Sequence, residues 1–327
     1  MDGKKFTMIV PTIKKDYIRI TRDFDDFFKF LPIKEIIFIG PDEVSELIDK
    51  DRSEGKLDER IGFLREDELI PADKLIGAMR NRVEAAGYEM AENSRPGWYY
   101  QQFLKMAYSE VCKDDYYISW DIDTIPLRKV DMFDDEGKPY FGIKNEYQPG
   151  YFKTIKNLFG FGKAIKQSFI AEHMIFSVKY MKEMIAEIMT LSIKGDTFYE
   201  KIFFSIDMDN LKLGFSEFET FGTWICIRHP ESYKLRDWHS MRKGGFFINS
   251  DELDEKAKEW LGGSFDAITF ESYNSVMPEL NEMFYNEEYR NGLTAEEFYR
   301  IALEGGLFGL FTEEGLIRTD TDVRWPY

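Results

Sequence analysis

The start of the chain alternates strand and helix in a way that limits the possible folds. An apolar run at residues 6–10 ends at Pro11-Thr12, residues 17–31 carry apolar side chains at helical spacing, and a second apolar run at residues 35–39 ends at Gly40-Pro41. Strand, helix and strand joined by turn residues form a βαβ unit, whose strands are parallel and whose crossover is right-handed. We therefore expect an α/β protein with a mixed, mostly parallel sheet flanked by helices.

The length of 327 residues and the hydrophobic content of 43% suffice for a sizeable core. No internal repeat, low-complexity run or linker divides the chain. We expect one catalytic domain over residues 1–250 and, packed on it, a helical extension over residues 251–327 whose last helix spans residues 295–304. Residues 145–166 are rich in Gly, Phe, Tyr and Lys with little periodicity, so a long functional loop is expected there.

The formal net charge of −17 argues against nucleic acid as a partner and against an anionic membrane surface as the main ligand. A phosphorylated ligand would need a local cation or a few placed basic groups. The first apolar run is too short for a signal peptide, and no run approaches the roughly 18 residues of a membrane span. We expect a cytoplasmic protein without a transmembrane segment, and peripheral association with a membrane-embedded acceptor remains open.

Four Asp-x-Asp triplets occur in the chain, so the triplet alone selects nothing: Asp23/Asp25, Asp121/Asp123, Asp207/Asp209 and Asp320/Asp322. Only Asp121/Asp123 directly follows an apolar, strand-like run. Because strand side chains alternate faces, we expect Asp121 and Asp123 to point the same way at the carboxyl end of a buried strand, where ligands bind in open α/β sheets. Such a pair suits a hard divalent cation that also binds phosphate oxygens. The alternative is a strand end with two solvated carboxylates.

A helix expected to begin near Trp98 leads into this strand. Its apolar face would pack on the sheet, while Gln102 and Lys105 share a polar face. That face is either solvated surface or lies near the Asp121 crevice. Lys105 is a candidate to contact a diphosphate, together with three basic residues further along the chain: Arg236, Arg242 and Lys243.

Four segments in a fixed order carry a resemblance to a known family: R-P-G-W-Y-Y-Q-Q-F-L-K (95–105), W-D-I-D-T (120–124), A-E-H-M-I-F (171–176) and S-E-F-E-T-F-G (216–222). They resemble a bacterial and archaeal group of uncharacterised proteins regarded as glycosyltransferases, the DUF6492 type. With the βαβ start and the Asp-x-Asp strand, the chain is similar to nucleotide-sugar-dependent glycosyltransferases of the GT-A fold, a Rossmann-like architecture.

The resemblance implies a Mn2+ or Mg2+ ion held between the donor diphosphate and Asp121 and Asp123, with Asp123 as the more direct ligand. It implies a histidine as third ligand, for which His239 is the choice over His229 and His173, although an ordinary surface histidine fits His239 as well. The donor would be bound by residues near the sheet end and by basic side chains: Pro11, Thr12, Gln102, Lys105, Asp121 and Arg236.

Inverting transfer requires a carboxylate to take the proton of the acceptor hydroxyl. Glu217 and Glu219 would lie on one face if their segment is extended, and Glu172 is held in reserve. Residues 223–227, which follow, read as a strand. Retaining transfer would need no such base and stays open.

The resulting hypothesis is an enzyme of the hexosyltransferase class (EC 2.4) in polysaccharide biosynthesis. It would move a sugar from a nucleotide donor to a glycan or lipid-linked oligosaccharide, and UDP is the favoured nucleotide. Two alternatives remain. A sugar-1-phosphate nucleotidylyltransferase is disfavoured because residues 10–12 read Val-Pro-Thr instead of a Gly-rich phosphate loop. A non-catalytic carbohydrate- or nucleotide-binding protein on the same fold is the other.

Overall fold

The computed structural model describes residues 4–19, 24–88 and 95–304. A five-stranded central sheet has the order β3-β2-β1-β4-β7. The first four strands are parallel, and β7 runs antiparallel to β4. This confirms the predicted mixed, mostly parallel α/β sheet. The strands are β1 (Phe6–Pro11), β2 (Ile33–Gly40), β3 (Ile61–Arg65), β4 (Tyr116–Trp120) and β7 (His173–Ser177).

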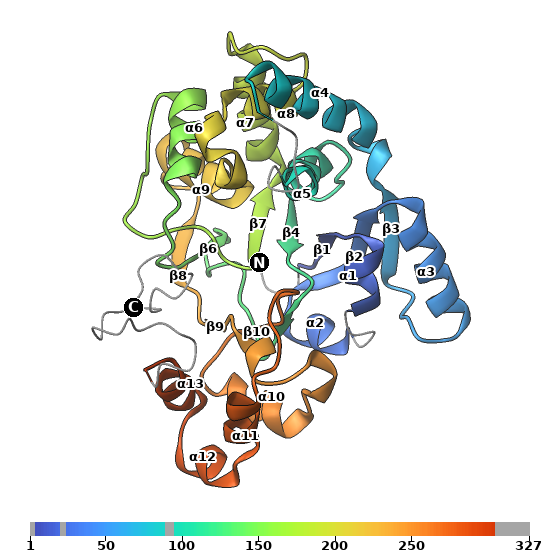
Figure 1. Ribbon diagram of the computed structural model, residues 1–327, viewed down its shortest axis with the longest axis vertical. Helices are drawn as coiled ribbons and strands as arrows, with labels where there is room; N and C mark the ends of the chain where they lie inside the picture. The colour runs from blue at the N-terminus through green and yellow to red at the C-terminus, as the bar shows by residue number, and fades with distance from the viewer. Residues whose placement is uncertain (1–3, 20–23, 89–94, 305–327) are drawn as a thin grey trace.

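Helices flank this sheet and form a cluster at each end of the long axis (Figure 1). In Figure 1, α4, α6, α7, α8 and α9 lie at one end of the molecule and α10–α13 at the other. The helices are α1 (Lys14–Arg19), α2 (Asp25–Phe30), α3 (Asp42–Ser53), α4 (Ala72–Ala85), α5 (Pro96–Ala107), α6 (Pro149–Phe159), α7 (Val178–Thr190), α8 (Phe198–Ser205), α9 (Glu217–Arg228), α10 (Glu255–Gly262), α11 (Pro278–Tyr285), α12 (Glu287–Gly292) and α13 (Ala295–Glu304).

Two small sheets extend the fold below and beside the central one. The first has the order β5-β10-β9 and the second pairs β6 with β8. Their strands are β5 (Thr124–Pro126), β6 (Tyr140–Ile143), β8 (Lys234–Asp237), β9 (Ser240–Met241) and β10 (Ala267–Thr269). Because β10 pairs with β5, the C-terminal part of the chain is joined to the strand that directly follows the Asp121 turn.

The buried apolar side chains form two clusters. The larger one fills the space around the central sheet. The smaller one contains Met241 and the buried side chains of α10, α11 and α13, and it also takes in Ile125 and Leu127. The C-terminal helices therefore complete their core with two side chains from the middle of the chain.

Three sequence-based expectations are corrected. Residues 145–166 contain α6, which begins with Pro149 in its first turn and ends at Gly160, a left-handed residue with φ +78. Residues 223–227 lie inside α9 and are not a strand. The single helix expected over residues 17–31 is two, α1 and α2, separated by residues 20–23, which lie outside the described part of the chain.

The order of the central sheet locates its topological switch point. From β1 the chain moves to β2 and β3 on one side, and β4 then pairs with β1 on its other side. Helical crossovers on opposite sides of such a switch leave a crevice at the carboxyl ends of the two middle strands. Those ends are Pro11-Thr12 of β1 and the turn at Asp121 after β4.

Candidate functional site

The carboxyl end of β1 is closely packed against that of β2. The Thr12 amide donates to the Ile39 carbonyl at 2.8 Å, and a Cβ placed on Gly40 would lie 2.4 Å from the Thr12 carbonyl oxygen. Only glycine fits at position 40 without a shift of this backbone. The register of β1 with β4 places Ile9 opposite Ser119, so Pro11 comes level with the Asp121 turn.

The selected Asp-x-Asp triplet lies in a turn and not in the strand itself. β4 ends at Trp120, and the Thr124 amide donates to the Asp121 carbonyl at 3.0 Å. Strand alternation therefore does not apply to Asp121 and Asp123, which corrects the reasoning from the sequence. The turn is held at both ends, because the Asp121 amide donates to the Glu172 carbonyl and the Asp123 carbonyl accepts from the Phe270 amide.

The Asp123 carboxyl is partly buried among other negative charges. Burial raises its pKa to about 7, and the nearby carboxylates of Asp121, Glu271 and Glu172 act in the same direction, while Arg19 opposes them. Within the described residues, no hydrogen bond or ion pair to the Asp123 carboxylate is found. This crowding of negative charge is the electrostatic setting in which a bound cation lowers the energy most.

Lys105 of α5 bridges Asp121 to a second carboxylate. Its ammonium Nζ lies 3.1 Å from Asp121 Oδ1 and 2.9 Å from Glu217 Oε1. The side chains of Lys105 and Glu217 are only 9% and 4% exposed, whereas that of Asp121 is 43% exposed. Burial would lower the Lys105 pKa, but the two carboxylates outweigh it and the pKa is raised. The lysine is thus a cation inside the site.

Gln102 lies one turn earlier on α5, and its side chain binds the main chain of Glu217. Its Oε1 accepts from the Glu217 amide at 3.1 Å, and its Nε2 donates to the Trp98 carbonyl. Gln102 is buried, so the polar face of α5 that could have been solvated surface faces protein instead. Of the two residues predicted for this face, Lys105 contacts Asp121 and Gln102 contacts the main chain of Glu217.

Glu217 and Glu219 do not share a face, because Ser216 caps a helix here. The Ser216 side chain accepts from the Glu219 amide and α9 starts at Glu217. Two residues apart on a helix point to opposite sides. Glu219 instead accepts from the Ser168 hydroxyl at 2.7 Å and the Phe169 amide at 3.0 Å, and it is fully buried. Burial raises its pKa.

Glu172 is a buried carboxylate with three donors around it. Lys144 Nζ lies 2.7 Å from Oε1, the Ser240 hydroxyl donates at 2.9 Å, and the Trp238 indole donates to Oε2. Burial by itself would raise its pKa, but Lys144 and Arg242 lower it to about 2. A carboxylate so well paired is a weak proton acceptor near neutral pH.

The charged residues around the Asp121 turn, called the lining here, include residues from the C-terminal part of the chain. Arg242 donates to Glu271 at 3.1 Å and to Glu146 at 2.8 Å. Three charged residues of this lining were not predicted from the sequence: Lys144, Glu146 and Glu271. Lys144 and Glu271 each directly follow an apolar strand, β6 for Lys144 and β10 with Phe270 for Glu271, and the sequence shows that pattern.

Arg236 and His239 lie beside the main cluster. Arg236 on β8 donates to the Asp131 carbonyl at 2.9 Å and stands 5.3 Å from the Trp238 ring. The main chain of His239 is tied to Asp266 through two hydrogen bonds. In the described part of the chain, no group of three His, Cys, Asp or Glu residues is close enough to hold a metal ion, so Asp121, Asp123 and His239 do not form a ready triad.

His173 is buried between two tryptophans. Its ring centroid lies 5.0 Å from that of Trp120 and 4.2 Å from that of Trp238, and its Nδ1 has no hydrogen-bond partner among the residues that the structure describes. Burial lowers its pKa to about 3, and Arg236 adds to the effect. The neutral ring is therefore part of the packing under β4 and β7.

The other Asp-x-Asp triplets have different surroundings. Asp207 begins a short 3-10 helix on the surface, where its side chain accepts from the Asp209 amide. Asp209 accepts from the Tyr88 hydroxyl at 2.9 Å. Asp23 and the Asp320/Asp322 triplet lie outside the described residues.

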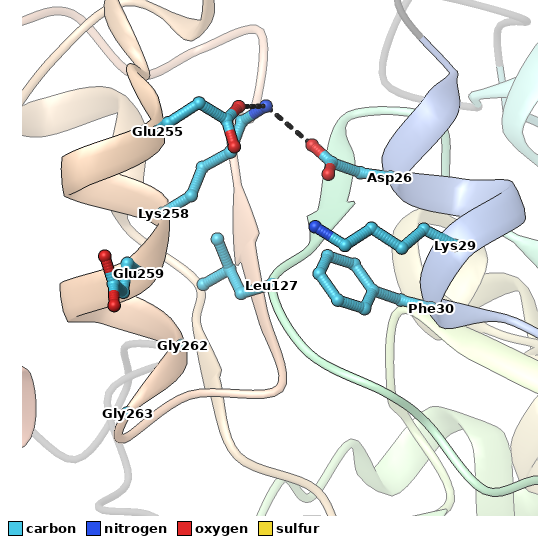
Figure 2. Close-up of a pocket in the computed structure, with 9 residues that line it drawn as sticks. All are labelled: Asp26, Lys29, Phe30, Leu127, Glu255, Lys258, Glu259, Gly262 and Gly263. Atoms are coloured by element: carbon cyan, nitrogen blue, oxygen red, sulfur yellow. Dashed lines mark hydrogen bonds and ion pairs between the residues drawn. The ribbon is translucent and has the colours of Figure 1, made fainter.

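A cavity of about 440 Å3 lies apart from this cluster, between α2 and α10 (Figure 2). Asp26, Lys29 and Phe30 line it from α2, and Leu127 lines it between the two helices. On the α10 side its rim carries Glu255, Lys258 and Glu259. Both lysines and carboxylates line it, so it carries charges of both signs.

Comparison with known families identifies the group. A family model described as "Family of unknown function (DUF6492)" matches residues 10–243. The chain belongs to the DUF6492 family. This confirms the resemblance found in the four sequence segments. The matched region includes Asp121, Asp123, Lys105 and Glu217, whereas Glu271 and the helices α10–α13 follow it.

Several solved glycosyltransferase structures are similar to this DUF6492 protein at low identity. Mouse xyloside xylosyltransferase 1 in its apo form is 15% identical, with 84% of this chain and 100% of that chain covered and a TM-score of 0.43. Galactosyltransferase LgtC with donor and acceptor sugar analogs is 12% identical, with 89% and 97% covered and a TM-score of 0.40. GlyE of Streptococcus pneumoniae TIGR4 is 9% identical, with 93% and 64% covered and a TM-score of 0.38.

A search of the curated proteins finds no match to this sequence. Among the described residues, no helix has the length and hydrophobicity needed to cross a bilayer.

Proposed function

We propose that this protein is a GT-A glycosyltransferase that moves a sugar from a nucleotide-sugar donor, UDP-linked in the first instance, to a glycan or lipid-linked glycan. The observation that carries the proposal is the position of Asp121 and Asp123, at the carboxyl end of β4 and beside the switch point of the sheet. Ligands of open α/β sheets bind there. A pair of carboxylates at that position needs a cation before it can accept an anionic diphosphate.

A divalent cation suits the oxygen atoms present. Asp121 and Asp123 offer carboxylate oxygens only, the ligands that Mg2+ and Mn2+ prefer, and Mg2+ is commonly held by one or two carboxylates together with phosphate and water. In that mode the two carboxylates need no third protein ligand, because phosphate oxygens of the diphosphate and water would complete the coordination. When bound, the ion would stabilise the negative charge that develops on the leaving diphosphate. His239 stays a predicted third ligand.

The donor would lie along the crevice between β1 and β4. Pro11 and Thr12 at the end of β1 would form one wall and the Asp121 turn the other. Gln102 and Lys105 would support that wall from α5, since their polar atoms contact Asp121 or the Glu217 segment. Arg236 would serve at the periphery of the site.

Glu217 is the carboxylate we assign to deprotonate the acceptor in an inverting reaction. Its Oε1 is paired with Lys105, and its Oε2 has no hydrogen-bond donor among the described residues. Glu219 and Glu172 are both occupied by several donors, which fits positioning roles. An attacking hydroxyl that approaches opposite the leaving diphosphate would transfer its proton to Glu217 as the new glycosidic bond forms.

The test combines one substitution with metal removal. Asp123→Asn should reduce UDP release from UDP-sugars about 100-fold or more, and EDTA should abolish it until Mn2+ or Mg2+ is restored. The matched control is Asp209→Asn, the second carboxylate of the surface triplet, which should change turnover less than twofold. Full donor turnover by Asp123→Asn in the presence of EDTA would contradict the metal-dependent mechanism.

A further inference from the structure

A lysine that was expected to contact the donor diphosphate lies instead between two carboxylates. Lys105 Nζ contacts Asp121 Oδ1 at 3.1 Å and Glu217 Oε1 at 2.9 Å. The side chain is 9% exposed, and the ammonium also stands 4.4 Å from the centre of the Phe218 ring. Two carboxylates and an aromatic face occupy its surroundings, so its charge is already balanced before any ligand binds.

The two carboxylates belong to opposite sides of the proposed reaction. Asp121 is 43% exposed and adjoins Asp123 on the donor side, whereas Glu217 is 4% exposed and is the proposed base on the acceptor side. The segments that carry them, the turn after β4 and the start of α9, contact α5 through Lys105 and Gln102. The Lys105 ammonium thus joins the two carboxylates.

We propose that Lys105 is a positioning residue, which acts on the reaction by orienting Asp121 and Glu217 relative to each other and makes no direct contact with the diphosphate. The inference rests on the proposed glycosyl transfer. Misplacing a reacting group by about 1 Å can lower a rate on the order of 100-fold, so loss of such a link would act mainly on kcat.

The experiment compares Lys105→Met, Glu217→Gln and the double variant. UDP affinity in the presence of Mn2+ is measured by calorimetry, and kcat and KM are measured as UDP release from whichever of UDP-glucose, UDP-galactose and UDP-N-acetylglucosamine the wild type hydrolyses. Lys105→Met should lower kcat at least 100-fold while the Kd for UDP changes less than threefold. The double variant should lie within threefold of the slower single variant, because residues that act as a unit give non-additive losses.

A matched control is Lys258→Met, since Lys258 also lies between two carboxylates but on the rim of the cavity in Figure 2. It should leave kcat within twofold of wild type. If Lys105→Met does not fold, Lys105→Gln keeps amide donors between the carboxylates without the charge, and the same kcat and Kd comparison applies to it.

Two results would overturn the inference. A loss of UDP affinity of tenfold or more in Lys105→Met would indicate direct contact with the diphosphate, and multiplicative losses in the double variant would indicate independent roles. Failure of the proposed function is recognised separately, because the wild type itself would then neither bind UDP with Mn2+ nor hydrolyse any donor, and the inference would fall with it.

Discussion

Lys105 and Lys258 each lie between two carboxylates, but the two lysines differ in what surrounds them. Lys105 joins Asp121 and Glu217, which come from separate elements, and two of the three side chains are less than 10% exposed. Lys258 joins Asp26 of α2 to Glu255 of its own helix, and Glu255 is 79% exposed. A lysine with two carboxylates therefore forms a largely buried cluster at the candidate site, whereas on the cavity rim one of the two carboxylates is in water.

The difference in burial between Lys105 and Lys258 bears on whether an ion pair serves function or stability. A buried ion pair costs desolvation energy that its attraction only partly repays, so retention of such a pair is better explained by geometry or chemistry than by stability. An exposed pair costs little and contributes little. Substitutions at the two lysines and at their partners therefore test this difference.

The largest loss of stability is expected for Lys105→Met. It would leave the buried Glu217 and the adjoining Asp121 without their cation, which for a buried pair costs about 3–5 kcal/mol of unfolding free energy. Urea denaturation at pH 7 measures it. Lys105→Met combined with Glu217→Gln should recover part of the loss, because the uncompensated charge is removed. A single variant within 1 kcal/mol of wild type would contradict the comparison.

A third buried pair, Lys144 with Glu172, predicts a dependence on pH. The Glu172 pKa is about 2 in the folded protein and 4.5 by its ordinary value, so the folded state holds fewer protons between these limits. The stabilisation is present above pH 4.5 and is lost as the pH falls toward 2. It amounts to about 3 kcal/mol.

Glu172→Gln should therefore be less stable than wild type at pH 6, and the difference should shrink by pH 3. Denaturant unfolding of both proteins across that range measures the gap. A gap that stays constant with pH would mean that the ionised carboxylate is not what stabilises this position.

A smaller effect is expected for Lys258→Met. Asp26 and Lys258 are 12% and 15% exposed, so Asp26 would lose a close partner at 2.6 Å but keep some access to water. We expect a loss of about 1–2 kcal/mol, within the range for a mostly buried polar group that loses its partner. The melting temperature should fall while UDP binding in the presence of Mn2+ is unchanged. A loss as large as that of Lys105→Met would remove the distinction between the two sites.

The smallest effect is expected for Glu255→Gln. Its carboxylate is three residues from Lys258 on the same helix and largely in water, and such pairs contribute about 0.5 kcal/mol or less. The change in melting temperature should be within about 1–2 °C, and added salt should not alter it further. A clear salt-dependent drop would show that the rim pair is stronger than its exposure suggests.

Local signals in the sequence predict part of the fold, whereas the helices α6 and α9 differ from what was expected. The βαβ start, the Asp121 strand and the last helix appear as expected. The helix α6 was missed although Pro149 and Gly160 mark its two ends, and α9 was missed although Ser216 and Glu219 have the spacing of a helix cap. The aromatic residues of both segments fit a strand or loop as well, and tertiary packing decided between them.

The candidate site was predictable only where its residues carry a local signal in the sequence. Asp121 and Asp123 could be selected because their context is local, an apolar run that ends at a turn. Lys144 and Glu271 carry a similar local signal, but nothing in it says that their strands end beside Asp121. Glu217 and Glu219 look equivalent in sequence, and only the helix separates them, one toward Lys105 and the other toward Ser168.

Residues close together in the chain are enough to specify the α/β class, the family, and the strand end that carries the acidic pair. Which side chains meet at that strand end depends instead on tertiary packing. The sheet order placed β1 beside β4, and the packing of α5 against α9 brought Lys105 between Asp121 and Glu217. Contacts between distant segments depend on how whole elements pack, and periodicity and spacing in a single sequence describe each element alone.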